Sequence, residues 1–157
     1  MVGDLPNSAK LWVYQSSRSF TPIEKEEISQ KGLLFVRDWA SHGSKLTAAF
    51  EIVYDRFLVL AVDETQMKAS GCSIDSSVGF VKEIERTYNV NLFDRLAVAF
   101  YKGEEIHVLP LTEFESLIDN RIVSPETIVF NNLVSTVGEF KSHWQVRAKN
   151  SWLARYF

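Results

Sequence analysis

The stretch that decides the fold is Phe57–Val62, FLVLAV, a run without one polar side chain. An apolar run of this length between polar segments is typical of a strand that is covered on both faces. A second β-rich run, Thr47–Tyr54, precedes it, and Asp55 and Arg56 alone separate the two, which leaves room for a tight hairpin. We therefore expect Phe57–Val62 to be a central strand that is joined to Thr47–Tyr54 by a hairpin.

Helices are expected before and after this hairpin. Thr21 and Glu24 form a capping-box pattern, which marks the start of the first helix. This helix carries an apolar stripe with helical spacing and is expected to stop at Gly43, because glycine readily adopts a left-handed conformation. The second helix is expected to begin around Ser73–Asp75 and to close at Asn89.

The remaining segments add four strands and one short helix. The strands are expected at Leu11–Ser16, Leu96–Tyr101, Glu105–Leu109 and Thr127–Phe130. Thr112 and Glu115 repeat the capping-box pattern before the short helix. The segment after Glu139 is too rich in aromatic residues for a free tail, so we expect it to pack back onto the domain.

The first six elements follow the order strand, helix, strand, strand, helix, strand, which is the ferredoxin-like βαββαβ arrangement. We expect an α+β fold, namely a mixed, mainly antiparallel sheet with this core plus a C-terminal hairpin strand, helix and strand. In this topology Leu11–Ser16 and Phe57–Val62 are parallel neighbours, because each helix makes a right-handed crossover. No linker, repeat or low-complexity segment interrupts the chain, so residues 1–157 are expected to form a single domain.

The composition is that of a globular protein, since 46% of the residues are hydrophobic and no apolar stretch approaches the length of a membrane span. The chain starts without the basic and apolar segments of a secretory signal, and its single cysteine, Cys72, cannot form an intramolecular disulfide. Both features favour a cytoplasmic protein without membrane association. The net charge of −3 disfavours nucleic acid as a partner, although the segment after Glu139 carries four basic residues and no acid.

The ferredoxin-like topology also predicts where a ligand would bind. The loops after the first and third strands would meet at one end of the sheet, and the N-termini of both helices would point there. Unpaired N–H groups and partial positive charge at helix N-termini favour a small anionic ligand. The candidate ligand-binding residues are Gln15 and Arg18 from the first loop and Asp63, Glu64, Ser70, Gly71, Cys72, Ser73 and Asp75 from the second.

Each of these residues also has a plainer structural interpretation. Ser73 or Asp75 could cap the second helix, with Cys72 as a small buried residue. Catalysis by Cys72 would need a nearby base, and His42 is expected at the opposite end of the sheet. Asp63, Glu64 and Asp75 could gather a magnesium ion, but three acids near one loop are more often caps and solvated charges. We therefore predict neither a metal nor a cofactor.

Four strings of the sequence are FEIVYDRFLVLAVDET at residues 50–65, ASGCSID at 69–75, FNNLV at 130–134 and SWLARYF at 151–157. With them the chain resembles a family of small bacterial proteins that often carry the label "ABC transporter ATPase", and the resemblance implies no established activity. Residues 57–64 have the look of a Walker B strand, a hydrophobic strand that ends in two acids. Since the phosphate-binding loop G-x-x-x-x-G-K-[ST] is missing, we expect no ATP hydrolysis.

The sequence leaves the function open among three hypotheses. The leading hypothesis is a non-catalytic binding or regulatory domain that takes a small anionic ligand or a protein partner at Ser70–Asp75. The second is an enzyme that uses Cys72 as a thiol nucleophile, or Asp63 and Glu64 with a metal. The third is a homo-oligomeric interaction protein whose edge strand or tail pairs between subunits.

Overall fold

The computed structural model describes residues 1–157 and shows an α+β fold with four α-helices and antiparallel sheets. The first half of the chain forms η1 (Val2–Asp4), β1 (Lys10–Gln15), α1 (Pro22–Asp38), β2 (Ala40–Ser41), β3 (Ser44–Lys45), β4 (Thr47–Val53), β5 (Phe57–Asp63) and α2 (Gly71–Tyr88), where η denotes a 3-10 helix. The second half forms β6 (Ala97–Lys102), β7 (Glu105–Pro110), α3 (Leu111–Asp119), β8 (Ile128–Phe130), α4 (Val137–His143), β9 (Gln145–Arg147), η2 (Ala148–Asn150) and η3 (Trp152–Tyr156). None of the helices combines the length and the apolar character that a membrane crossing needs.

Strand β5 is the central strand of a three-stranded sheet with the order β1-β5-β4, as the sequence predicts. All of Phe57–Val62 is buried, because both faces of the strand are covered. The β4–β5 hairpin is also confirmed, with Val53 opposite Phe57. Its turn places Tyr54 and Asp55 in the left-handed region, at φ 52° and 61°, which aspartate adopts more readily than tyrosine.

The predicted direction of β1 is wrong. β1 and β5 are neighbours, but they run antiparallel, with Lys10 opposite Val62 and Gln15 opposite Phe57. Helix α1 carries the chain from β1 to β4 at the far edge, and the hairpin then returns β5 between them, so β5 must oppose both neighbours. The ferredoxin-like arrangement is not confirmed, because β6 leaves this sheet and joins a second one with the order β7-β6-β8-β9.

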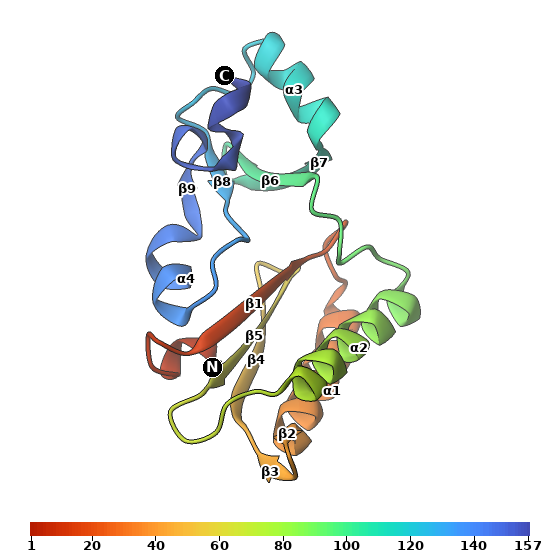
Figure 1. Ribbon diagram of the computed structural model, residues 1–157. Coiled ribbons are helices and arrows are strands. Elements are labelled where there is room, and N and C mark those ends of the chain that lie inside the picture. Colours follow the sequence, from red (N-terminus) through yellow and green to blue (C-terminus); the bar gives the residue numbers. More distant parts are fainter.

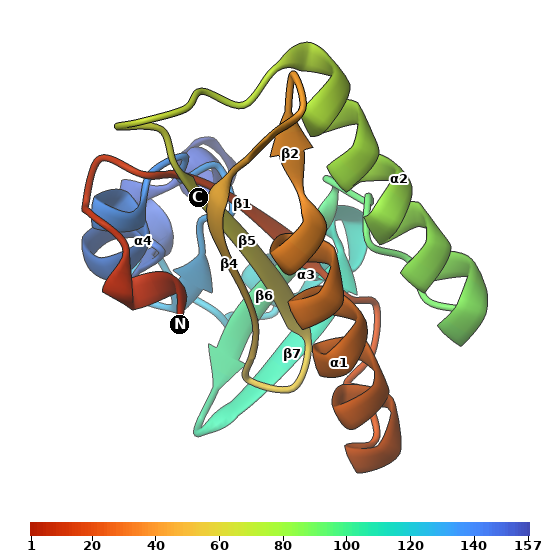
Figure 2. The ribbon, with the colours of Figure 1, turned by 90° about the horizontal axis from the view of Figure 1, so that it is seen from below.

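Both faces of the first sheet are covered by other elements of the chain. Helices α1 and α2 lie side by side over one face, as Figures 1 and 2 show, and pack there around Leu58, Leu60 and Val62. The other face carries Phe57 and Val59 into a second core that also contains residues of the second sheet and of α4. A third cluster lies between the second sheet, α3 and the C-terminal 3-10 helix.

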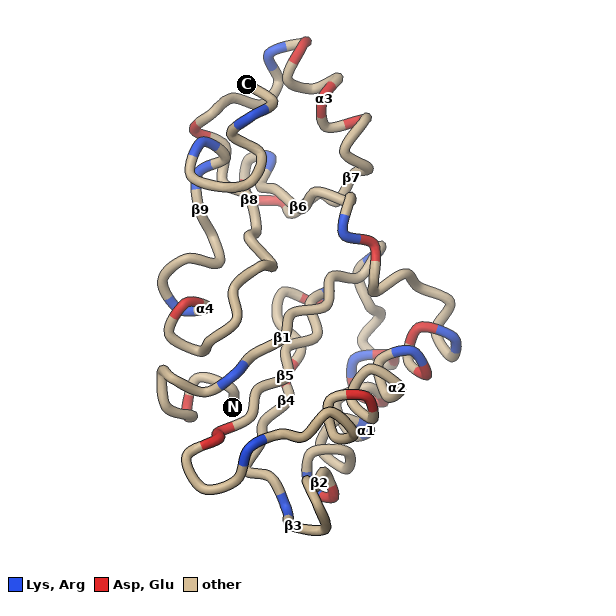
Figure 3. The backbone as a smooth tube through the Cα atoms, viewed as in Figure 1, with Lys and Arg blue, Asp and Glu red and all other residues tan.

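The segment after Glu139 packs back onto the protein, as expected. Trp144, Ala148 and Leu153 are all buried, and β9 pairs with β8 in the second sheet. Acidic and basic residues are interspersed over both sheets and their helices (Figure 3). Two basic residues of this segment also lie beside an acid, because Arg147 and Lys149 both form ion pairs with Glu126.

Candidate functional site

The two loops that were predicted to form one site lie at opposite ends of the first sheet. Gln15, at the end of β1, is opposite Phe57, where β5 begins, whereas Asp63 ends β5. Seven residues of β-strand span roughly 20 Å. The antiparallel direction of β1 therefore separates Gln15 and Arg18 from the residues of the second loop.

The Ser70–Asp75 turn forms the N-terminus of α2. The Ser70 hydroxyl accepts a hydrogen bond from the Ser73 N–H (3.1 Å), and the Ser73 hydroxyl oxygen accepts one from the Ser70 N–H (2.6 Å), which completes a capping box. The Trp39 indole N–H donates to the Ser73 carbonyl (2.8 Å), so this end of α2 is also tied to the end of α1. A capped helix start is thus confirmed, but the N-cap is Ser70 and not Ser73 or Asp75; Ser73 contributes as the third residue of the helix, which starts at Gly71 and not at Ser73–Asp75.

Cys72, on the first turn of α2, and Asp75, at the start of the second, are both exposed, so the expectation of a buried cysteine is wrong. His42 lies in the β2–β3 turn, and β2 contacts α2. Trp39, which directly precedes β2, donates its hydrogen bond to Ser73, so β2 lies near the N-terminal end of α2. The expectation that His42 lies at the opposite end of the sheet is therefore wrong as well. No hydrogen bond joins the Cys72 thiol to His42 or to any other side chain.

The carboxylates of Asp63 and Glu64 hold the loop that leads from β5 to α2. Asp63 Oδ1 accepts the Thr65 N–H (3.0 Å), and Glu64 Oε2 accepts the Ala69 N–H (2.8 Å). The other oxygen of Glu64 lies 3.3 Å from Lys10 Nζ. The structure contains no group of three or more His, Cys, Asp or Glu side chains that could hold a metal ion, so these carboxylates do not gather with Asp75.

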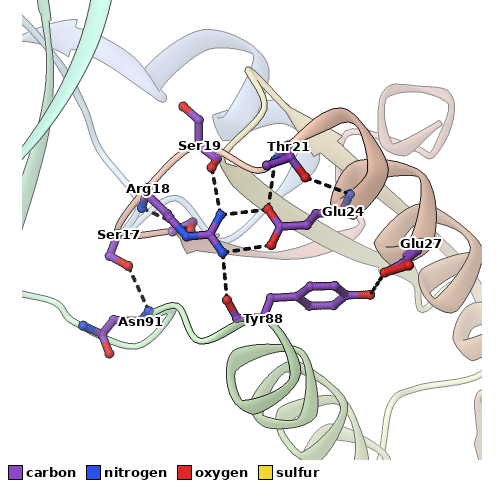
Figure 4. A network of polar contacts seen from close by, with 9 residues as sticks. Ser17, Arg18, Ser19, Thr21, Glu24, Glu27, Tyr88 and Asn91 are labelled. Carbon is purple, nitrogen blue, oxygen red and sulfur yellow. Dashed lines mark hydrogen bonds and ion pairs between the residues drawn. The ribbon is translucent and has the colours of Figure 1, made fainter.

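Arg18 fastens the loop after β1 to both helices (Figure 4). Its two terminal nitrogens each lie 2.8 Å from an oxygen of Glu24, and Nη2 also donates to the carbonyl of Tyr88, the last residue of α2 (2.8 Å). The hydrogen bonds from Arg18, followed by the one from the Thr21 N–H, lower the pKa of Glu24 from 4.5 to about 2. Arg18 is therefore already occupied by groups of the protein itself.

Gln15 joins the two sheets through a chain of amide contacts. Its Nε2 donates to the carbonyl of Ala97 at the start of β6 (3.3 Å), and its Oε1 accepts from Asn132 (2.9 Å). Asn132 in turn accepts from the indole N–H of the buried Trp144 (2.9 Å). Gln15 is buried and both ends of its amide are satisfied, so its role is structural.

A groove of about 820 Å³ follows the outer edge of β1 and was not predicted from the sequence. Its walls come from segments on either side of β1 in Figure 1, namely α2 with the loop before β6, and the segment after β8 with η3. The apolar residues of these walls include Ile74, Val78, Phe93, Leu133, Val134 and Trp152. This volume lies within the range of small-molecule and peptide binding sites.

The backbone edge of β1 forms the floor of this groove. The Leu11 N–H donates to the Ser135 carbonyl (3.0 Å), so Leu11 turns its backbone groups away from β5. Because hydrogen-bonded and non-bonded residues alternate in an antiparallel pair, Val13 and Gln15 face the same way. The protein's loops and side chains make no hydrogen bond to the N–H or C=O of Val13. A short piece of open strand edge therefore lies within an apolar groove.

Three residues with polar side-chain tips also line this groove. Trp12 and Tyr14 lie on the same face of β1, and neither the indole N–H of Trp12 nor the hydroxyl of Tyr14 has a hydrogen-bond partner in the protein. Arg95 lines the groove from the loop before β6 and takes part in no ion pair. Burial raises the pKa of the Tyr14 hydroxyl, and the nearby charge of Arg95 partly offsets this.

Comparison of the chain with family models, with curated proteins and with solved structures found no match, so function has to be inferred from the geometry of the chain itself.

Proposed function

We propose that this protein is a non-catalytic binding protein that takes an extended segment of a protein partner along the outer edge of β1. The observation that carries the proposal is the outward-facing backbone of Val13 at the floor of an apolar groove. A peptide that adds a strand to such an edge gains main-chain hydrogen bonds for affinity, while the walls select its side chains.

The protein's own chain already uses the adjoining part of this edge in the same manner. Thr136 forms an antiparallel bridge with Lys10, and Ser135 accepts the Leu11 N–H. Between Asn131 and Val134 the chain makes no further bridge to β1: the Asn131 side chain accepts the Leu133 N–H, and Asn132 reaches Gln15 through its side chain alone. A bound segment would continue from this bridge toward Gln15.

The size and the lining of the groove define the occupant. From Leu11 to Gln15 the edge spans roughly 14 Å, which suits about four extended residues. Side chains of an added strand would alternate between the side of Trp12, Ile74 and Phe93 and the side of Leu11 and Val134, and both sides are apolar. The best occupant is therefore an uninterrupted apolar run, as in a strand that is covered on both faces.

The Ser70–Asp75 turn is less suited to an anionic ligand. Both hydroxyls of its capping box are engaged within the protein, and the carboxylates of Asp63 and Glu64 are used to hold the loop that leads into the turn. We also expect no ATP hydrolysis, because the Walker B-like acids hold their own loop. The single exposed Cys72 fits a reducing compartment, so we place the protein in the cytoplasm.

A selection of random seven-residue peptides on the purified protein tests the proposal. Peptides with an apolar run should be enriched, and Ile74→Glu should weaken the best of them roughly tenfold to a hundredfold, since a buried apolar side chain contributes about 1.5 to 3 kcal/mol. Ile23→Glu is the matched control, because Ile23 is a 71% exposed apolar residue near the start of α1, outside the groove. The proposal is refuted if no peptide is enriched, or if both variants bind alike.

A further inference from the structure

The end of the groove near Gln15 differs from the other end in its charge. At the start of β1, Lys10 is paired with Glu64, so the two charges there offset each other. At the other end, Arg95 is exposed and makes no ion pair, although Asp94 is its neighbour in sequence. The Asp94 carboxylate turns back onto its own loop, where Oδ1 accepts the Leu96 N–H (2.9 Å). The guanidinium of Arg95 is thus free to bind a ligand.

Tyr14 places a second donor beside this cation. Its ring packs edge-on against Phe93 with ring centroids 5.4 Å apart, which holds the half-buried side chain in the groove. The hydroxyl has no partner in the protein; burial raises the pKa of Tyr14, and the nearby charge of Arg95 offsets part of this rise. A hydroxyl and a guanidinium in one partly buried corner form a donor pair without an acceptor of their own.

We infer that the segment bound along β1 carries a carboxylate, which accepts a hydrogen bond from Tyr14 and pairs with Arg95. This inference rests on the proposed function and gives the bound segment a second property besides its apolar run. A carboxylate suits the corner because charge-assisted hydrogen bonds are strong in partly buried sites. It could be an acidic side chain or the C-terminus of the segment, and both present the same two oxygens.

The peptides enriched by selection provide the probe. The tightest one is resynthesised in matched forms, with the acidic side chain as its amide and with the C-terminus either free or amidated. Loss of the recognised carboxylate should weaken binding roughly tenfold or more, and the form that loses affinity identifies its source. If no form differs from the others, the inference is wrong.

Charge reversal on the protein tests the same contact from the other side. Arg95→Glu should weaken the acidic peptide at least tenfold and should enrich basic peptides in a fresh selection. Lys82→Glu is the control with the same change of charge, because Lys82 is exposed on α2, makes no ion pair and does not line the groove. Tyr14→Phe should weaken the acidic form more than its amide, while a merely structural role of the hydroxyl would affect both forms equally.

The two proposals fail in different ways. If enriched peptides are sensitive to Ile74→Glu but contain no essential carboxylate and bind Arg95→Glu normally, the carboxylate inference is overturned and the groove remains the binding site. If peptides ignore Ile74→Glu, the groove itself is overturned. Thermal unfolding of every variant shows that the compared proteins are folded.

Discussion

Gly32 allows α1 to lie directly on the first sheet, and this contact gives a quantitative test of the fold. A Cβ added at Gly32 would lie 2.0 Å from Cδ1 and 2.3 Å from Cε1 of Phe50 in β4. Non-bonded carbon atoms are normally about 3.5 to 4.0 Å apart, so either the helix or the ring must move. Phe50 is 7% exposed and belongs to the core between helices and sheet, which leaves the ring no free space.

We therefore expect Gly32→Ala to destabilise the protein, although alanine is the better helix former. The gain in helix propensity is about 1 kcal/mol. Overpacking of a core costs about 1 to 3 kcal/mol, and complete displacement of a buried phenylalanine about 3 to 5 kcal/mol. The net loss should be about 2 to 3 kcal/mol, which for a protein of this size corresponds to a fall in Tm of roughly 5 to 10 °C.

Urea unfolding followed by circular dichroism measures this loss, and Gly79→Ala is its matched control. Gly79 also lies inside a helix, α2, but a Cβ there would meet no heavy atom within 4 Å. Gly79→Ala should raise the free energy of unfolding by about 0.5 to 1 kcal/mol. If Gly32→Ala were as stable as the wild type, or if combination with Phe50→Leu gave no relief, the close packing of α1 on β4 would be refuted.

Three further predictions concern polar side chains. The folded pKa of Glu24 is lowered to about 2, so its contribution to stability is present above pH 4.5 and is lost as the pH falls through 2. At pH 7, Glu24→Gln should lower the free energy of unfolding by about 1 to 1.5 kcal/mol, a value that is reduced for solvent screening because Arg18 is 44% exposed. In urea unfolding at pH 2, this variant and the wild type should show almost no difference in stability. Ser70→Ala removes the N-cap of α2 and should lower the free energy of unfolding by about 1 kcal/mol, whereas Ser76→Ala, inside the helix, should not. Arg56 is 9% exposed, its Nε has no hydrogen-bond partner and burial lowers its pKa, so Arg56→Met should leave Tm unchanged or raise it; a marked fall would show that the guanidinium has a partner.

Local patterns predicted the elements of the fold well. The apolar run Phe57–Val62 is buried throughout, and the Thr21 capping box and the left-handed Asn89 mark helix ends as expected. The capping box that was expected at Thr112 does not form. Strand β7 runs directly into α3, so Pro110 takes the N-cap position and Thr112 already lies inside the helix. Gly43 is left-handed, but in the β2–β3 turn after α1 has ended at Asp38.

The direction of β1 follows from the predicted order of elements and not from local patterns. The crossover through α1 makes β1 and β4 parallel, and the β4–β5 hairpin then makes β5 antiparallel to β1, so the crossover rule was applied to the wrong pair of strands. A strand that is buried on both faces has the same composition whether its neighbours are parallel or antiparallel, and the second cover can be a helix layer or another sheet. The predicted meeting of Gln15 and Arg18 with the Ser70–Asp75 turn failed because the predicted direction of β1 was wrong.

The groove was missed because its walls are distant in sequence. Ile74 and Leu133 meet the edge of β1 only after α2 and the second sheet have been placed, and the strings ASGCSID and FNNLV that contain them do not indicate a groove. Trp12 and Tyr14 have the spacing of ordinary strand residues, so their unpaired polar tips become visible only once their surroundings are known. The one usable signal was the charged pair Asp94-Arg95, which follows Leu92 and Phe93 in the loop before β6.

The surroundings of the strand edges explain why an open edge at β1 can persist in a soluble protein. Open edges promote aggregation, and proteins usually cover them or add charges. The outer strand β4 contacts η1, whose Val2 N–H donates to Glu51 (3.0 Å), and β7 carries Glu105 and His107 along its length. The edge at Val13 has neither cover nor charge, but α2 and the segment after β8 stand on both sides of it. These walls exclude the edge of another sheet while they admit a single extended segment, which is the property that a peptide-binding edge requires.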